Sequence, residues 1–147
     1  DDLADSAGLA NCYGKQGIIL LGLGRLDNAM ALLKKQEALF DDLGDRAGLA
    51  LCYGNQAPIL MLGKPDEAMA LLKKQEALYD DLANPAGLGT SYWNQGMMLR
   101  QQGKLREAID LCERTLIIER KLKNPDCESH WRILEKMKKD LAADPPP

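Results

Sequence analysis

The eleven-residue stretch AMALLKKQEAL occurs twice in this chain, at Ala29–Leu39 and again without a change at Ala68–Leu78. An active site brings different residues together at one point, so it seldom requires such a repetition. A stack of equivalent units does require it, because each unit presents the same surface to its neighbour. The repetition therefore predicts an array of similar units.

The rest of the sequence aligns around this stretch as three units, spaced by 40 and then 39 residues. The tripeptide Ala-Gly-Leu marks the register at 7–9, 47–49 and 86–88. The other positions that align in all three units are Tyr13, Tyr53 and Tyr92; Gln16, Gln56 and Gln95; Gly24, Gly63 and Gly103; and Ala29, Ala68 and Ala108. A period of this length indicates a solenoid.

The pattern within one unit is typical of two helices. In the first unit, apolar and small residues recur at steps of three and four on either side of Gly24-Arg25, which separates the two stripes. Asp45 and the pair Asn84-Pro85 are typical starts of the next units, with a capping side chain and a proline in the first turn. Aromatic residues make up only 5% of the chain, which also favours an all-α fold over strands.

These positions resemble the tetratricopeptide signature, W-x-x-L-G-x-x-Y followed by A-x-x-x-F. The residues that carry the resemblance are Tyr13, Gln16, Gly17, Leu20, Ala29 and Leu33; Tyr53, Gln56, Ala57, Leu60, Ala68 and Leu72; and Tyr92, Gln95, Gly96, Leu99, Ala108 and Cys112. The period exceeds the usual 34 of the family, as in kinesin light chain-type and bacterial arrays. Gly17 and Ala29 are expected to let the two helices of a unit approach closely.

The resemblance implies an all-α, right-handed superhelical solenoid of three tetratricopeptide-like helix pairs with a C-terminal capping helix. The expected boundaries are a single solenoid over 1–143, units over about 5–43, 45–82 and 84–122, a capping helix over 124–143, and a disordered tail over 144–147. The first ten residues repeat 41–50 closely, which predicts that the chain is a piece of a longer array.

Two departures from the family pattern lead to local predictions. Glutamine replaces the usual apolar residue at 16, 56 and 95, and Gln36 and Gln75 repeat on the second helices. We expect a ladder of glutamine hydrogen bonds between units, and the alternative is that these amides lie at the edge of the packed face and contact water. Pro58 stands where a helix interior is expected, and proline removes one backbone hydrogen bond there. We therefore expect a bend, or a helix that restarts, near Gly54–Pro58.

Composition and charge exclude several functional classes. The formal net charge is −3, so no overall positive field would attract nucleic acid or an anionic membrane surface. The sequence has no apolar run long enough to cross a bilayer and no secretory leader, which predicts a cytoplasmic location. None of the four cysteines forms a C-x-x-C pair, so we expect buried thiols and neither a zinc site nor a disulfide framework.

Residues suited to catalysis or to cofactor binding do not cluster in the sequence. His130 is the only histidine, and the paired aspartates recur once per unit at expected helix ends, as a solvated ridge would. Lys34-Lys35 and Lys73-Lys74 are similarly interpreted as a solvated basic rim. The sequence therefore predicts a protein that is not an enzyme and that has no metal or cofactor.

The resemblance implies that function lies in a concave groove lined by the first helix of each unit, where such proteins hold a peptide or a partner helix. The residues expected to bind there are Asn11, Lys15, Ile18, Asn55, Met61, Trp93, Asn94, Met97 and Arg100. Asn55 and Asn94 are equivalent and suit contact with a peptide backbone, and Trp93 is the expected apolar anchor.

The expected function is therefore a protein–protein interaction scaffold with a protein or peptide partner. Two alternatives stay open at this point. The first is a self-associating module, a homo-oligomer formed through an exposed first unit around Leu3 and Leu9. The second is a regulatory sensor arm of a larger signalling protein or enzyme.

Overall fold

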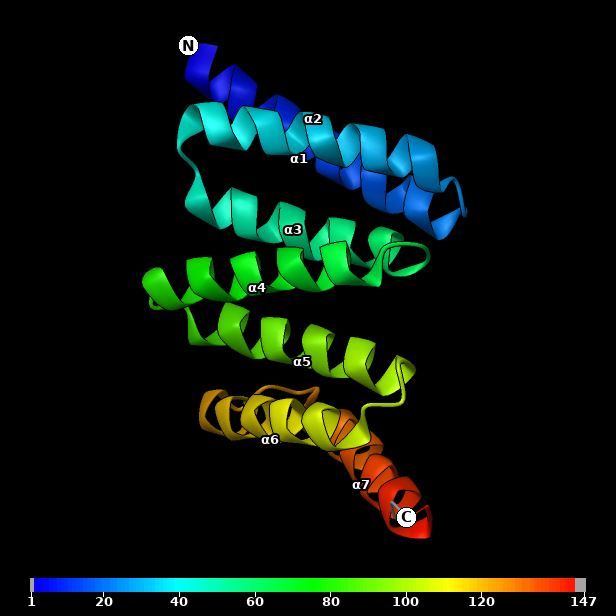
Figure 1. Ribbon diagram of the computed structural model, residues 1–147. Coiled ribbons are helices and arrows are strands. Elements are labelled where there is room, and N and C mark those ends of the chain that lie inside the picture. The colour runs from blue at the N-terminus through cyan, green and yellow to red at the C-terminus, as the bar shows by residue number, and fades with distance from the viewer. Residues whose placement is uncertain (1, 145–147) are drawn as a thin grey trace. The chain divides into compact units, whose positions relative to one another are not determined.

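The computed structural model describes residues 2–144, and all regular structure in this range is helical. The helices are α1 (Asp2–Gly22), α2 (Leu26–Leu43), α3 (Arg46–Met61), α4 (Pro65–Asp81), α5 (Pro85–Gln101), α6 (Leu105–Leu122) and α7 (Cys127–Ala143). Figure 1 shows α1 and α2 side by side, and likewise α5 and α6 further along the chain. The predicted all-α helical repeat is confirmed.

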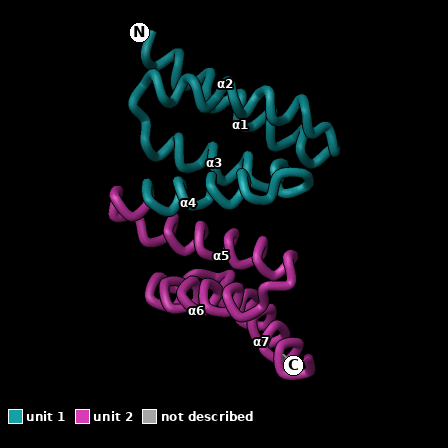
Figure 2. The backbone as a smooth tube through the Cα atoms, viewed as in Figure 1, with its two compact units in different colours: residues 1–78 teal, residues 79–147 magenta. Residues whose placement is uncertain are grey.

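The chain divides into two compact units, residues 1–78 and residues 79–147, which Figure 2 shows in teal and magenta. Unit 1 holds α1, α2, α3 and most of α4, and unit 2 holds α5, α6 and α7. A single right-handed solenoid over 1–143 stays a prediction. Of the expected tail, residues 145–147 lie outside the described part of the chain.

The turns between helices form where the sequence has capping residues. Asp45 accepts a hydrogen bond from the Gly48 amide, and Asn84 accepts one from the Gly87 amide, both at 2.9 Å. Each bond satisfies one of the free N–H groups at a helix start. Gly24 has a φ of 73°, a left-handed conformation that glycine adopts without strain.

Within unit 1, α1 and α2 pack closely because small residues lie at their crossing. A Cβ atom on Gly17 would lie 2.9 Å from Leu33 Cδ2 and 3.5 Å from the backbone oxygen of Ala29. Leu33 and Ala29 are both fully buried. The close approach expected from Gly17 and Ala29 is confirmed.

The contact between α2 and α3 forms a second part of the core. Phe40 packs with Ala10 and Cys52, and its ring lies over Gly48, where an added Cβ atom would come within 2.6 Å. The aromatic ring therefore occupies the space that a side chain on Gly48 would require.

A helix that restarts near Pro58 is wrong, because α3 continues from Arg46 to Met61 with Pro58 inside it, whereas a bend near Gly54–Pro58 stays a prediction. Pro58 is exposed, so its ring does not disturb a packed face. The helix ends three residues later, and the backbone N–H of Lys64 bonds to the Leu60 carbonyl at 2.6 Å. Only one helical hydrogen bond is lost at this proline.

Gln56, Gln75 and Gln95 are buried as expected, but the bonds of Gln56 and Gln75 differ from a glutamine ladder. Gln56 Nε2 donates to Glu37 Oε2 at 2.7 Å, and Gln75 Nε2 donates to the Ala50 carbonyl at 2.9 Å. In unit 2, Gln95 Nε2 donates to Ser91 Oγ at 3.3 Å. Gln16 is exposed on α1. Gln56 and Gln75 therefore donate to acceptors on a neighbouring helix that are not glutamines, so the expected ladder does not form at these two positions.

Gln56→Leu is expected to lower the free energy of unfolding by about 1–2 kcal/mol, because it removes a hydrogen bond to a carboxylate. The equivalent substitution Gln16→Leu is the matched control. It is expected to change the free energy of unfolding by less than about 0.5 kcal/mol, since Gln16 is exposed. Urea unfolding of the two variants measures the difference. Equal effects would contradict the account of the Gln56–Glu37 bond.

The hydrogen bond between Gln56 and Glu37 also predicts that the free energy of unfolding depends on pH. Burial by itself would raise the pKa of the Glu37 carboxyl, but hydrogen bonds from Lys34 and Gln56 outweigh it and lower the pKa. A carboxyl with a lowered pKa adds stability above its unfolded-state pKa, and that stability is lost as the pH falls through the folded-state pKa. The acid-induced loss of stability is therefore expected to be smaller in Gln56→Leu than in the wild type.

Candidate partner-binding surfaces

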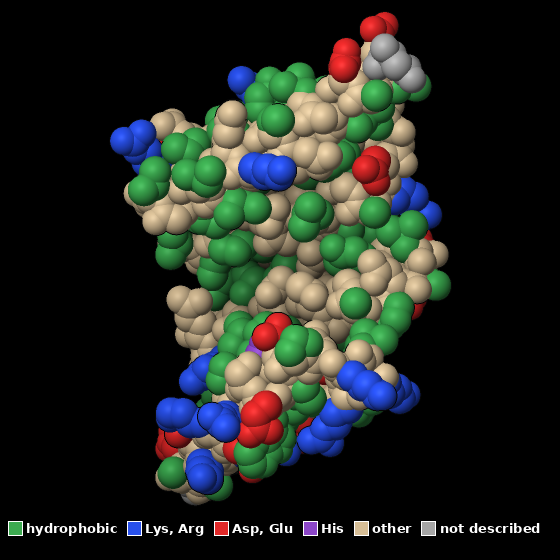
Figure 3. All heavy atoms as spheres, turned by 180° about the vertical axis from the view of Figure 1, so that it is seen from behind, with side chains coloured by type: hydrophobic (Ala, Val, Ile, Leu, Met, Phe, Trp, Pro, Cys, Tyr) green, Lys and Arg blue, Asp and Glu red, His purple; other side chains and the backbone are tan. Residues whose placement is uncertain are grey.

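The residues predicted for the groove lie on the first helix of each repeat, and in unit 1 they leave an open surface. Asn11 and Lys15 are exposed on α1, and Ile18 keeps 50% of its surface exposed. Leu51 of α3, equivalent to Asn11, is 48% exposed. Two large apolar side chains thus face solvent beside polar residues. The view in Figure 3 shows hydrophobic side chains over the upper part of the molecule, whereas charged ones gather at its lower end.

Asn55 has an amide donor without an acceptor. Its side chain is half-buried, and its Nδ2 atom is buried with no hydrogen-bond partner among the described residues. A buried donor without an acceptor costs free energy, which an acceptor from a ligand would recover. Met61, six residues later on the same helix, is also half-buried.

In unit 2, Trp93 is a packing residue. Its ring stacks on His130 of α7, with centroids 3.8 Å apart and planes 22° apart. His130 Nδ1 in turn lies 2.8 Å from Oε1 of the buried Glu119 of α6. Trp93 thereby links α5 to α7, and the part of its surface that stays exposed is the part available to a partner.

The other predicted groove residues of unit 2 are also half-buried. Asn94, Met97 and Arg100 follow Trp93 along α5 at positions equivalent to Asn55, Pro58 and Met61. An amide, a thioether and a guanidinium therefore lie on the same helix as Trp93. Their role in binding stays a prediction.

The lysine pairs have partners that the sequence did not indicate. Lys35 lies 5.7 Å from the Tyr13 ring centroid, Lys74 lies 5.8 Å from that of Tyr53, and Arg114 lies 6.0 Å from that of Tyr92. These are cation–π contacts between the two helices of a repeat. The basic residues at these positions therefore help to join the helix pairs, so an interpretation as a purely solvated rim is incomplete.

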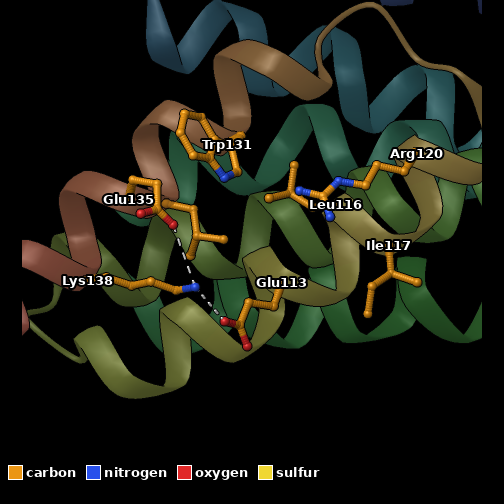
Figure 4. Close-up of a pocket in the computed structure, with 8 residues that line it drawn as sticks. Glu113, Leu116, Ile117, Arg120, Trp131, Glu135 and Lys138 are labelled. Atoms are coloured by element: carbon orange, nitrogen blue, oxygen red, sulfur yellow. Dashed lines mark ion pairs between the residues drawn. The ribbon is translucent and has the colours of Figure 1, made fainter.

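A pocket between α6 and α7 also escaped the sequence analysis. It has a volume of about 260 Å³, and Leu116, Ile117, Trp131 and Leu134 give it apolar walls. Figure 4 shows Lys138 between Glu113 and Glu135 at its edge, with ion pairs of 2.9 and 3.8 Å. The only hint of this pocket that the sequence offers is that equivalent positions recur in another repeat.

Unit 1 has a pocket of about 290 Å³ at the equivalent place, lined on α2 by Lys34, Glu37, Ala38 and Asp41. These residues precede Glu113, Leu116, Ile117 and Arg120 by 79 positions, two repeat lengths. The charges at the two ends are reversed, because lysine aligns with Glu113 and aspartate with Arg120. The two pockets therefore differ in the charged residues at their ends.

The cysteines are only partly as expected. Cys52 and Cys112 are buried, but Cys12 is exposed, so the expectation that all four are buried is wrong. Cys12 and Cys52 are equivalent, and they differ because α2 covers Cys52 whereas no described helix covers Cys12.

Thiol reactivity is expected to follow this difference. Burial raises the pKa of the Cys52 and Cys112 thiols to about 12, so both stay protonated and unreactive near neutral pH. Ellman's reagent is expected to modify Cys12 in the folded chain, and to modify Cys52 and Cys112 only in denaturant. Rapid labelling of Cys52 in a folded Cys12→Ser variant would contradict this expectation.

No helix in residues 2–144 combines the length and the apolar character that crossing a membrane requires. No group of three or more histidine, cysteine, aspartate or glutamate side chains in this range is arranged to hold a metal ion.

Comparison with known protein families gives one match, to the tetratricopeptide repeat over residues 88–126. This segment contains most of α5, all of α6 and the turn after it, and the two preceding helix pairs repeat its sequence. Residues 88–126 form a tetratricopeptide repeat, and the all-helical repeat structure of the chain is consistent with that family. No curated protein matches it. Tetratricopeptide repeats are non-enzymatic scaffolds that mediate protein–protein interactions.

Proposed function

We propose that this helical repeat protein binds an extended segment of a protein partner along the groove-side surface of its first helices. The surface consists of Asn11, Lys15, Ile18, Asn55 and Met61 in unit 1 and of Trp93, Asn94, Met97 and Arg100 in unit 2. The observation that carries the proposal is the pairing of exposed apolar side chains, Ile18 and Leu51, with the unpartnered amide of Asn55.

The chemistry of this surface suits a peptide backbone. The Asn55 amide has a donor to offer to a carbonyl oxygen, and the equivalent Asn94 offers the same group in unit 2. Apolar side chains exposed on a folded surface are stabilised when a partner covers them. Lys15 is exposed and offers a cation to a carboxylate of the partner.

The test is quantitative capture of partners from the source lysate with immobilised wild-type chain and variants. Ile18→Asp and the double variant Asn55→Ala/Asn94→Ala are each expected to lower the captured amount by about tenfold, as loss of a central contact does. Ile19→Asp is the matched control, since Ile19 is exposed on another face of α1 and its variant should capture normally.

Two outcomes would overturn the proposal. The first is capture of the same proteins, in the same amounts, by the wild type and by both groove variants. The second is recovery of the chain alone, with a sedimentation mass that rises with concentration, which would favour self-association. Circular dichroism of each variant verifies that the helical content is unchanged.

A further inference from the structure

The pocket between α6 and α7 has an apolar floor and an apolar rim. Leu116 and Leu134 form the floor and are 4% and 2% exposed. Ile117 and Trp131 line the same pocket but keep 56% and 40% of their surface exposed. Large apolar side chains in such a position are stabilised when a ligand covers them. The walls of the pocket therefore suit an apolar group.

The charged residues of the pocket are paired at one end only. There Lys138 forms ion pairs with Glu113 at 2.9 Å and with Glu135 at 3.8 Å. Arg120 lies at the other end, where it is exposed, and no carboxylate among residues 2–144 pairs with its guanidinium (Figure 4). A guanidinium matches a carboxylate through two parallel hydrogen bonds. Arg120 is therefore the cation that a ligand can use.

Trp131 offers a second donor on the same side. Figure 4 shows the nitrogen of its indole ring on the side that faces Leu116 and Arg120. The indole N–H group is a donor only, and no acceptor among the described residues bonds to it. An anion held at Arg120 would supply the acceptor that the indole of a partly buried tryptophan usually has.

A pocket at this place also forms where a further helix follows. Unit 1 has one at the equivalent place on α2, and that pocket stays open although α4 follows α3. Its charges differ, because Asp41 is equivalent to Arg120 and Glu37 is equivalent to Leu116. The unpaired cation beside an apolar floor is therefore particular to the pocket of unit 2.

We propose that this pocket binds a small monocarboxylate, whose carboxylate pairs with Arg120 and whose aliphatic or aromatic body covers Leu116 and Ile117. The volume of about 260 Å³ lies just below the range of about 300–1,000 Å³ that drug-sized ligands occupy. It suits a molecule of roughly ten non-hydrogen atoms, at about 30 Å³ for each water-sized group. A single negative charge fits better than the two of a phosphate, because Glu113 and Glu135 share one lysine at the opposite end.

An extended peptide fits this pocket less well. No amide or hydroxyl side chain of the described residues lines it. The backbone groups within α6 and α7 are paired along each helix. A peptide backbone would therefore lose hydrogen bonds to water here without recovering them. The pocket is assigned to a small molecule, separately from the groove-side residues of the first helices.

The probe is hydrocinnamate, a phenyl ring on a short chain that ends in a carboxylate. Its binding to the isotope-labelled full chain is followed by nuclear magnetic resonance on the indole N–H signal of Trp131. The chain has two tryptophans, and the signal that disappears in Trp131→Phe identifies the one in the pocket. We expect this signal to shift saturably, with a dissociation constant on the order of 1–5 mM for so small a ligand.

Matched variants and a neutral analogue test the role of the cation. Arg120→Gln is expected to weaken binding at least about tenfold, as loss of a hydrogen-bonded charge does. Lys121→Gln removes the same charge from the next residue, which is exposed on α6 and does not line the pocket, so binding should stay within about twofold. Hydrocinnamamide is expected to bind the wild type about tenfold more weakly than the acid, and acid and amide should bind Arg120→Gln alike.

Three results would overturn the inference. One is the absence of a saturable shift of the Trp131 signal in the folded wild type. Another is equal binding of hydrocinnamate by the wild type and Arg120→Gln, or equal binding of acid and amide by the wild type. The third is a protein partner that Arg120→Gln fails to capture and Lys121→Gln retains, together with no binding of the probe, because the pocket would then hold a protein segment. Since Arg120 is not a groove residue, failure of the groove proposal is recognised separately.

Discussion

Gly48→Ala is expected to lower the free energy of unfolding by about 1–3 kcal/mol, although alanine favours helices. The new Cβ atom would lie 2.6 Å from Phe40 Cγ and Cδ1, closer than folded proteins tolerate. A ring fixed between Ala10 and Cys52 has little freedom to move away. Urea unfolding followed by far-ultraviolet circular dichroism measures the loss.

Gly8→Ala is the matched control, since Gly8 is equivalent to Gly48 but meets no neighbour within 4 Å. Here alanine is expected to raise the free energy of unfolding by about 0.5–1 kcal/mol through helix propensity alone. If Gly48→Ala lowers and Gly8→Ala raises the free energy of unfolding, the two equivalent positions differ because a neighbouring helix packs on Gly48 and not on Gly8. A stabilising effect at both would contradict it.

Leu33→Ala is expected to cost about 2–5 kcal/mol of unfolding free energy. Leu33 is fully buried and lies against Gly17, whose missing side chain leaves room for it. Backbone atoms on the facing helix cannot easily move to fill the cavity, so the loss should lie well above the average for point substitutions.

Leu23→Ala is the control for that substitution, because Leu23 is 65% exposed in the turn that follows α1. Its effect is expected to stay within about 0.5 kcal/mol. Differential scanning calorimetry compares the two variants with the wild type. A similar decrease in the melting temperature for both would show that the α1–α2 contact contributes less than the structure indicates.

The helical framework could be predicted from the sequence because it depends on local signals. The caps at Asp45 and Asn84 act within one turn, and the small residues Gly17 and Ala29 recur at fixed spacing. The family match over residues 88–126 agrees with that register. Periodicity alone is enough to place such features on helices.

The contacts between side chains could not be predicted in the same way. The hydrogen-bond partner of Gln56 depends on how far α3 is shifted along α2. That shift brings Glu37, and not a second glutamine, within reach of the Gln56 amide. The stacking of Trp93 on His130 joins residues far apart in sequence. The exposure of Cys12 depends on what covers α1, which the residues of α1 do not encode.

The proposed groove is tested most directly by site-specific photo-crosslinking. A benzoylphenylalanine at position 51, on the groove side of α3, is compared in lysate with one at position 67, where Glu67 is exposed in the first turn of α4. We expect position 51 to crosslink a protein partner that position 67 does not, and Asn55→Ala in the same chain to reduce that product. Equal products from both positions, or crosslinks only between copies of the chain, would contradict a partner-binding groove on the first helices.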